Sequence, residues 1–324
     1  MNRYKCPACG GNQYTSADTA EGCIYCGNKE LKKMEKLEPE GVDVKLSIEL
    51  LHSDCLEPMK DISDGSIGIN KVYCMDNLKL MKQMEDGSVD LIYCDILYNT
   101  GKKFDDFDDN LGSPQEAIEW YRPRIREMHR VLKDTGSIYL QCDSNLVHYL
   151  KVEMDKVFGI KNFQRDIIWR IGWVSGYKTQ AKNWIRNHDN ILYYTKSNKF
   201  TFNKEYIPYP EGYVRHGKKP KGKGIPIEDT WNCSENDILN SIQIMSFSKE
   251  KVGYNTQKPK KLLERIIKAS SNKGDIVADF FCGSGTTGVV AKELGRNYIM
   301  CDINPRAVEI SERRISEARI NPNK

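Results

Sequence analysis

The sequence lacks the long apolar segments that membrane and secreted proteins carry. Its 324 residues contain no run of about 18 apolar side chains, which excludes a membrane-spanning helix. The first residues, MNRYKC, include no apolar stretch of the kind that directs secretion, so no signal peptide is expected. A hydrophobic content of 39% and a charged content of 29% instead describe a soluble globular protein that can bury a sizeable core.

A disulfide framework and a strong excess of one charge are also missing. The eleven cysteines are an odd number, and seven of them stand singly, several in predicted strands. This distribution predicts a reduced, cytoplasmic protein with buried thiols. The net charge of +4 is too small to identify a partner, so the placement of charge along the chain is more informative than its sum.

The other four cysteines form two C-x-x-C-Gly pairs near the start of the chain. Cys6 and Cys9 make the first pair and Cys23 and Cys26 the second, with thirteen residues between the pairs. Four thiolates presented by two tight turns complete a tetrahedral site for structural Zn²⁺. The alternative is four unliganded cysteines in an exposed polar segment. We predict a small zinc ribbon, which would serve binding or docking and no catalysis.

A glycine-rich loop near the C-terminus is the most informative segment. It reads DFFCGSGTTG over 279–288, after an apolar strand-like run at 275–278 and before a helix-like run at 289–294. Strand, glycine turn and helix in this order build a ligand cradle in doubly wound α/β folds, because small residues let the backbone approach the ligand and the helix N-terminus presents free N–H groups. An ordinary glycine-rich turn is the alternative.

The residues that follow this loop favour its interpretation as a ligand cradle over an ordinary turn. The next predicted strand spans 295–301 and ends at Asp302, about 20 residues past the loop, where an acidic side chain can hold ribose hydroxyls. Asp302 could instead be the N-cap of the last predicted helix, 305–320. One residue could serve both roles.

A weak internal repeat leads to a second candidate site. An acidic residue, a short helix and an Asp-Gly turn at 54–67 recur 22 residues later at 76–89. The second copy continues through a strand, 89–94, into the tetrapeptide DILY, which begins at Asp95. The carboxyl end of a buried strand is where α/β enzymes place their chemistry. The alternative, which the tetrapeptide taken alone favours, is that Asp95 caps a turn and Tyr98 packs in the core.

Predicted helices and strands alternate between about residues 113 and 195. Helices are expected at 113–132 and 143–158, and strands at 136–142, 167–169 and 190–195.

The alternation is lost between about 196 and 250 and returns at TQKP, 256–259, which opens a predicted helix at 260–271. The irregular part includes RHGKKPKGKG at 215–224, in which five positive charges fall within nine residues. Such a cationic segment suits phosphates, and a solvated lysine loop is the alternative. The neighbouring aromatic residues, which could stack on bases or form a local core, are Tyr206, Tyr209, Tyr213 and Trp231.

Three motifs in this order resemble those of the S-adenosylmethionine-dependent DNA amino-methyltransferases. DILY at 95–98 is similar to their catalytic Asp-Pro-Pro-Tyr tetrapeptide, and TQKP at 256–259 is similar to the segment before their cofactor loop. Asp279 followed by FCGSG at 281–285 resembles the cofactor loop itself. The order of tetrapeptide, variable insert and cofactor loop is that of the permuted, β-type enzymes, and the resemblance spans about 70–320.

The resemblance implies a fold and a division of the chain. The expected fold is α/β, a circularly permuted, doubly wound Rossmann-like methyltransferase sheet. We expect a zinc ribbon at 1–30, a linker at 31–45, the catalytic half of the methyltransferase domain at 46–195, a target-recognition insert at 196–250 and the cofactor-binding half at 251–324.

The resemblance also implies roles for the motif residues. Asp95 would accept a hydrogen bond from the exocyclic amine of a flipped base, the carbonyl of Ile96 would accept a second, and Tyr98 would stack on the base. The residues expected to contact S-adenosylmethionine are Asp76, Lys258, Asp279, Phe281, Gly283, Gly285, Thr286 and Asp302. Those expected to contact DNA are Arg170, Lys178, Arg186, Arg215, Lys218, Lys219, Lys221 and Lys223.

An Asp at the first position of the tetrapeptide is typical of adenine-N6 enzymes in this resemblance. We therefore expect site-specific N6-adenine methylation of double-stranded DNA, with cytosine-N4 methylation as the alternative. The sequence departs from the family at Ile96 and Leu97, where two prolines are expected, and so loses the rigidity that proline gives. A non-catalytic DNA-binding relative, and an RNA or protein methyltransferase, stay open. A homodimer and a separate restriction endonuclease partner are also left open, and no membrane partner is expected.

Overall fold

The computed structural model describes residues 2–5, 12–15, 32–33, 67–104, 107–172, 180, 182–214, 216–218, 220–233, 237, 244 and 248–320. By its internal contacts the chain separates into two compact units, Met1–Leu56 and Glu57–Lys324. In the smaller unit, three antiparallel strands form a sheet in the order β2-β1-β3: β1 (Asn2–Lys5), β2 (Asn12–Thr15) and β3 (Lys32–Lys33).

Several predictions fall outside the described residues. The residues concerned are the four proposed zinc ligands, Cys6, Cys9, Cys23 and Cys26, together with Lys178, Arg215, Lys219 and positions 54–66 of the first repeat copy. The zinc ribbon therefore stays a prediction.

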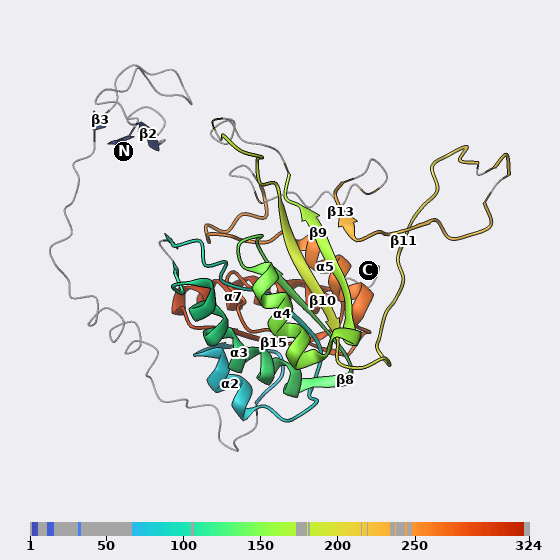
Figure 1. Ribbon diagram of the computed structural model, residues 1–324, viewed down its shortest axis with the longest axis horizontal. Helices are drawn as coiled ribbons and strands as arrows, with labels where there is room; N and C mark the ends of the chain where they lie inside the picture. The colour runs from blue at the N-terminus through green and yellow to red at the C-terminus, as the bar shows by residue number, and fades with distance from the viewer. Residues whose placement is uncertain are drawn as a thin grey trace. The chain divides into compact units, whose positions relative to one another are not determined.

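The larger unit is organised around an eight-stranded sheet in the order β13-β9-β10-β8-β5-β14-β15-β4 (Figure 1). The strands are β4 (Lys71–Cys74), β5 (Val89–Asp95), β8 (Leu132–Cys142), β9 (Phe163–Arg170), β10 (His188–Thr195), β13 (Thr230–Trp231), β14 (Ile276–Asp279) and β15 (Asn297–Asp302). β10 runs antiparallel to β8 and β9, and all other neighbours are parallel. This arrangement confirms the predicted doubly wound α/β sheet.

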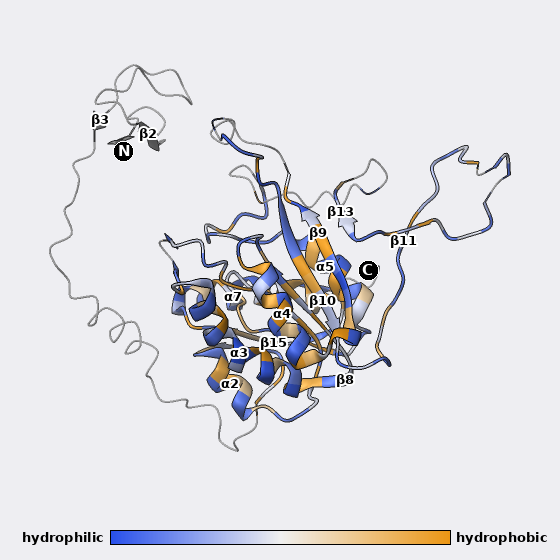
Figure 2. Cartoon of the chain, viewed as in Figure 1, coloured by the Kyte–Doolittle hydropathy of each residue, from blue (hydrophilic) through white to orange (hydrophobic). Residues whose placement is uncertain are grey.

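Helices cover both faces of the sheet. They are α2 (Asn77–Gln83), α3 (Pro114–Val131), α4 (Val147–Phe158), α5 (Lys260–Ser270), α6 (Thr286–Glu293) and α7 (Pro305–Glu317). Successive strand side chains point to opposite faces, so Ile92 packs in a core with α2, α3 and α4, whereas Leu91 packs in a core with α5 and α6. Figure 2 shows hydrophobic residues concentrated in the strands and hydrophilic residues in the outer helix turns and loops.

Shorter elements complete the described part of the larger unit. They are β6 (Lys102–Lys103) paired with β7 (Asp108–Asp109), β11 (Tyr206–Ile207) paired with β12 (Ile225–Pro226), and a 3-10 turn, η1 (Ile160–Asn162). No helix among the described residues is both long enough and apolar enough to cross a bilayer.

Several element boundaries differ from the sequence prediction, and contacts in the structure explain the starts of α4 and α6. α4 begins at Val147, not at 143, because the Asp143 carboxylate accepts the Asn145 N–H at 2.9 Å and forms a local turn. α6 begins earlier than predicted, at Thr286, so Gly288 lies inside the helix. A Cβ at Gly288 would come 2.6 Å from the Ile315 side chain of α7, so close packing of the two helices requires glycine there. The last helix ends at Glu317, not at 320.

The strand order creates a topological switch point between β5 and β14. These two strands are parallel neighbours. The chain leaves β5 through α3 toward β8 on one side, and leaves β14 through α6 toward β15 on the other. Loops that diverge in this way leave a crevice beyond the carboxyl ends of the strands, where ligands bind in open α/β sheets. The tetrapeptide at 95–98 and the glycine loop at 279–288 both begin at this point.

Candidate functional site

Asp95 is the last residue of β5, and its carboxylate is engaged from two sides. Oδ1 accepts the Tyr98 hydroxyl at 2.7 Å, and Oδ2 forms an ion pair with the Lys258 ammonium. Burial raises the pKa of Asp95, and the charge and hydrogen bond of Lys258 oppose that rise without cancelling it. The structure therefore brings three predicted site residues together around one carboxylate.

A second carboxylate, Asp189 on β10, faces the same phenol. Asp189 is 4% exposed, and its Oδ2 lies 3.0 Å from the Tyr98 hydroxyl and accepts the Gln141 side-chain N–H at 3.0 Å. Its Oδ1 forms an ion pair with the Arg186 guanidinium. The Tyr98 hydroxyl has one proton, so it can donate to only one of the two carboxylates at a time. Burial, Asp95 and Asp189 together raise the pKa of Tyr98 well above its usual value.

The backbone of the tetrapeptide is fixed by two hydrogen bonds. The Ile96 N–H, which a proline would lack, donates to the carbonyl of Gln141 at 3.3 Å. The buried Tyr121 hydroxyl on α3 donates to the carbonyl of Leu97 at 2.8 Å. The Tyr121 ring also lies 6.3 Å from the Phe281 ring of the glycine loop. These contacts restrain the turn at the two positions where the resemblance expects prolines.

Lys258 reaches Asp95 from the segment that precedes α5. The neighbouring Gln257 anchors this segment, because its side chain donates to the carbonyl of Glu250 at 2.6 Å and accepts the Val252 N–H at 3.0 Å. Lys258 was expected to contact the cofactor, whereas the structure places its ammonium on the candidate catalytic carboxylate.

Asp279, the last residue of β14, is buried and forms hydrogen bonds with two residues of the glycine loop. Its side chain is 2% exposed and accepts the Phe281 N–H at 3.0 Å and the Thr287 hydroxyl at 2.6 Å. Burial raises the pKa of Asp279 to about 7, assisted by the nearby charges of Asp95 and Asp302 and opposed by the two hydrogen bonds. The carboxyl group ties the start of the loop to the first turn of α6.

Asp302 holds the same loop from β15. Its Oδ2 accepts the Gly283 N–H at 2.8 Å, and its Oδ1 accepts the Asn304 N–H at 2.9 Å. The N-cap of α7 is Asn304, whose side chain accepts the Arg306 N–H at 2.9 Å. The alternative in which Asp302 caps the last helix is therefore wrong.

Two buried arginines, neither of which the sequence motifs indicated, brace the loop. Arg314 on α7 donates to the Ser284 carbonyl and lies 3.0 Å from both the Ser284 and the Thr286 hydroxyl oxygens. Arg124 on α3 acts on the loop indirectly, because it forms an ion pair with Asp76 at 2.7 Å and donates to Asn77 at 2.8 Å at the start of α2.

Asn77 in turn donates to the carbonyl of Phe280 at 2.9 Å. Asp76, the N-cap of α2, is thus joined to the start of the glycine loop through Arg124 and Asn77. Pairs such as these join residues far apart in the sequence, and a local motif gives no signal for them.

The predicted DNA contacts that the structure describes are spread along the chain. Arg186 lies at the site, while four others are exposed: Arg170, Lys218, Lys221 and Lys223. Of the aromatic residues near the basic segment, Trp231 is 6% exposed and belongs to a core cluster, which favours the local-core alternative for that residue. Tyr209 and Tyr213 stack on each other with ring centroids 5.2 Å apart.

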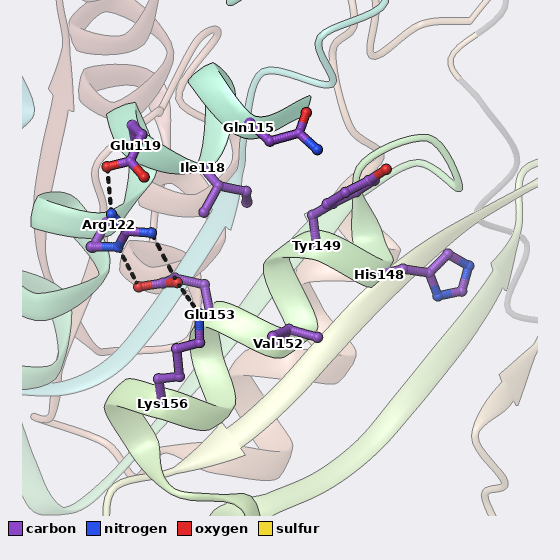
Figure 3. A pocket seen from close by; sticks show the side chains of 9 residues that line it. All are labelled: Gln115, Ile118, Glu119, Arg122, His148, Tyr149, Val152, Glu153 and Lys156. Atoms are coloured by element: carbon purple, nitrogen blue, oxygen red, sulfur yellow. Dashed lines mark hydrogen bonds and ion pairs between the residues drawn. The ribbon is translucent and has the colours of Figure 1, made fainter. Parts of the chain in front are cut away.

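A hollow of about 360 Å³ lies between α3 and α4 (Figure 3). Ile118, Val152 and Tyr149 provide its apolar lining, and Arg122 joins Glu119 and Glu153 across it (Figure 3). It contains none of the predicted site residues. In the described ranges, no cluster of three or more metal-ligating side chains is present.

Comparison with known proteins gives consistent matches to the larger unit, Glu57–Lys324. A family model described as DNA methylase matches residues 89–313. The type II methyltransferase M.HpaI of Haemophilus parainfluenzae is 34% identical over 250 residues, covering 76% of this chain and 74% of that protein. The DNA adenine methyltransferase YhdJ of Escherichia coli K12 is 32% identical over 259 residues, covering 75% and 81%.

A solved structure shares the fold. The PvuII DNA methyltransferase, described as cytosine-N4-specific, superposes with a TM-score of 0.55 at 17% identity, covering 80% of this chain and 90% of that one. At this identity the likeness supports the fold alone.

Proposed function

This chain belongs to the DNA methylase family, and on that premise we propose that it transfers the methyl group of S-adenosylmethionine to the exocyclic N6 amine of adenine in double-stranded DNA. The adjacency of Asp95 and the glycine loop across the switch point carries the proposal. A methyl donor held by the loop and an amine held by Asp95 would meet between two neighbouring strand ends, which provides the alignment that a direct transfer needs.

Two observations support adenine as the base. The tetrapeptide begins with Asp95, the residue type that the adenine-N6 resemblance implies. One relative, identical at 32% of aligned positions, is named a DNA adenine methyltransferase. The likeness to a cytosine-N4 enzyme is a likeness of fold and does not favour cytosine.

The residues of the glycine loop fit S-adenosylmethionine. Gly283 and Gly285 have φ values of 47° and 73°, which let the loop fold back beneath α6. The backbone at the start of α6 would suit the methionine carboxylate. The Asp302 carboxylate, already accepting the Gly283 N–H, has lone pairs left for a ribose hydroxyl. The partly buried Phe281 ring offers an apolar wall.

When bound, the cofactor supplies an electrophilic methyl group on a sulfonium. Asp95 would accept an N–H of the adenine amine, which orients the nitrogen lone pair and balances the positive charge that develops on nitrogen during transfer. The same carboxylate would take the proton that the methylated nitrogen then loses and pass it to solvent. The carbonyl of Ile96 would accept the second N–H. Tyr98 and Lys258 each engage one Asp95 oxygen in the structure, and each oxygen has a further lone pair with which it can accept the amine.

Tyr98 would complete the pocket by turning from the carboxylates to stack on the flipped base. Asp189 would keep its hydrogen bond from Gln141 and its ion pair with Arg186 after the phenol leaves. The rotation of Tyr98 therefore leaves Asp189 with hydrogen-bond and ion-pair partners.

The test is methyl transfer from labelled S-adenosylmethionine to unmodified genomic DNA, with the digested nucleosides identified by mass spectrometry. We expect N6-methyladenine from the wild type and a loss of about 10²–10³-fold in kcat for Asp95→Asn, because the amide lacks the compensating charge. Cofactor binding by Asp95→Asn should stay close to wild type. N4-methylcytosine as the product would overturn the choice of base, and no product on any DNA would overturn the proposed function.

We also propose that the four cysteines at 6, 9, 23 and 26 bind one structural Zn²⁺, on the strength of their spacing alone. Metal analysis of the purified full chain should return about one zinc per chain, and conversion of Cys6 and Cys9 to Ser should abolish it. The homodimer and the endonuclease partner stay open.

A further inference from the structure

Trp184 is the most exposed large apolar side chain that the structure describes. Its exposed fraction is 96%, compared with 71% for Ile160, the next in rank. Leaving an indole in water forgoes the burial that normally makes tryptophan favourable in a fold. On a surface that binds nucleic acid, an exposed aromatic ring indicates a stacking partner in the ligand. Trp184 shares its loop, residues 182–187, with the exposed cations Lys182 and Arg186.

The loop stands directly beside the candidate site. Arg186, two residues after Trp184, has its guanidinium carbon 5.9 Å from the Tyr98 ring centroid and forms an ion pair with Asp189. Consecutive Cα atoms are about 3.8 Å apart, so the Trp184 and Arg186 backbones lie within about 8 Å of each other. The indole is therefore within reach of DNA that has a base in the pocket.

The C-terminal end of this loop is anchored to the sheet. The Ile171 N–H donates to the carbonyl of Asn187 at 3.1 Å, and the Asn187 side chain donates to the carbonyl of Gly172 at 2.6 Å. These bonds hold the loop where β9 and β10 run side by side (Figure 1). A side chain carried on an anchored loop can act as a wedge, because the backbone behind it resists displacement.

We propose that Trp184 enters the duplex at the position vacated by the flipped base and stacks on the base pairs that remain. The inference rests on the proposed function, since only an enzyme that flips its base leaves such a gap. Large apolar side chains that insert between base steps, and aromatic rings that stack on any base, are established ways of stabilising distorted DNA. Lys182 and Arg186 lie on either side of the indole along the chain and would contact flanking phosphates.

The experiment compares the wild type with Trp184→Ala, Trp184→Phe and a control, Phe202→Ala. Phe202 is 49% exposed and lies at the opposite end of β10 from Trp184, where the Thr201 N–H donates to the carbonyl of Thr135 at 3.2 Å near the start of β8. Two duplexes carry a site that the wild type methylates. In one the target adenine is paired with thymine, and in the other it faces an abasic position, where flipping costs less.

We expect Trp184→Ala to lower kcat/KM about tenfold or more on the paired duplex and less than about threefold on the abasic duplex. Trp184→Phe should retain most activity, and Phe202→Ala should match the wild type on both. With 2-aminopurine at the target position, Trp184→Ala should show a smaller rise in fluorescence on binding than the wild type.

Two results would overturn the role of Trp184 while leaving the proposed function intact. One is full activity of Trp184→Ala on the paired duplex. The other is an equal loss on both duplexes, which would make Trp184 a general affinity contact. A wild type that methylates no DNA would instead overturn the proposed function, and this inference with it.

Discussion

The two loops that meet at the switch point are held in different ways. In the glycine loop, the acidic side chains Asp279 and Asp302 bond to backbone N–H groups and to a buried hydroxyl of the same unit. In the tetrapeptide, the Asp95 carboxylate is occupied by the ends of two side chains, Tyr98 and Lys258. The glycine loop is thus held mainly through its own backbone groups, whereas the Asp95 carboxylate is held by two side chains that can rearrange when a base enters.

Arg314→Met removes a buried support of the glycine loop and should have the largest effect on stability. The change removes the cation that contacts the Ser284 carbonyl and the Ser284 and Thr286 hydroxyls from inside the fold. Buried acceptors left without a donor cost about 1–3 kcal/mol each, so we expect a loss of roughly 3 kcal/mol in the free energy of unfolding and weaker cofactor binding.

Urea denaturation and calorimetric titration with S-adenosylmethionine would measure both quantities. Arg313→Met is the matched control, because its side chain is exposed on the same helix turn. Equal stability of the two variants would contradict the role given to Arg314.

Asp279→Asn tests whether the buried carboxyl group of the glycine loop titrates. The unfolded pKa is near 3.8 and the folded pKa is about 7, so the folded state retains a proton that the unfolded state releases. Stability contributed by this group is complete below about pH 4 and is lost as the pH rises to about 7. The neutral amide should therefore be more stable than the wild type at pH 8, by roughly 2 kcal/mol and at most about 4.

Thermal or urea unfolding of both proteins between pH 4 and pH 8 would measure the difference, which should vanish at the acidic end. Asp134→Asn, whose carboxylate is 89% exposed, should show no such divergence. Parallel curves for Asp279→Asn and the wild type would contradict the raised pKa.

Tyr121→Phe weakens the support of the tetrapeptide without touching the carboxylate. The variant deletes the hydroxyl that donates to the Leu97 carbonyl and leaves the ring against Phe281. We expect a loss of about 1–2 kcal/mol in stability and a fall in kcat of roughly tenfold, with KM for the cofactor little changed. Steady-state kinetics beside Tyr149→Phe, an exposed tyrosine on α4, would show the difference. A kcat equal to wild type would mean that the turn needs no such restraint.

Lys258→Met should have the smallest effect, seen mainly in the pH profile. The ammonium opposes the rise in the pKa of Asp95 caused by burial, so its removal raises that pKa further. Because the ionised carboxylate is the form that accepts the amine, the acidic limb of kcat against pH should move to higher pH, with rates converging on the alkaline side. The exposed neighbour Lys261→Met is the control. An unmoved acidic limb would show that Lys258 does not tune Asp95.

Sequence reasoning was strongest where a single segment carries its own signal. The glycine loop and the strand before Asp95 combine an apolar run with a turn, and both elements are present at the predicted positions. The edge strand β13 was missed, because two residues that pair only with β9 leave no distinctive pattern. The start of α6 was misplaced because Gly288 has low helix propensity, and only its packing against α7 explains it.

The partners of the motif residues were harder to predict than the motifs. Asp189 lies at the second position of the strand HDNILYYT, before its apolar run, and an acidic residue at that place is a sequence signal for a second carboxylate. Arg124 and Arg314 carry no such signal, since each acts across more than 25 residues of chain. Propensity and spacing describe local structure, whereas these pairings exist only once the sheet has formed.

The hydroxyl of Tyr98 is a donor for which the two carboxylates of the site compete. Two carboxylates approach one hydroxyl, and a single proton can serve only one of them. An entering adenine amine carries two N–H groups of its own, so one of them can replace the Tyr98 hydroxyl on Asp95 while Tyr98 moves away. A nucleobase that presents a carbonyl oxygen at the same place would bring an acceptor to a site already rich in acceptors. The cationic donors near it would be Lys258 and Arg186, which already pair with Asp95 and Asp189, so an amine suits the two carboxylates better than a carbonyl does.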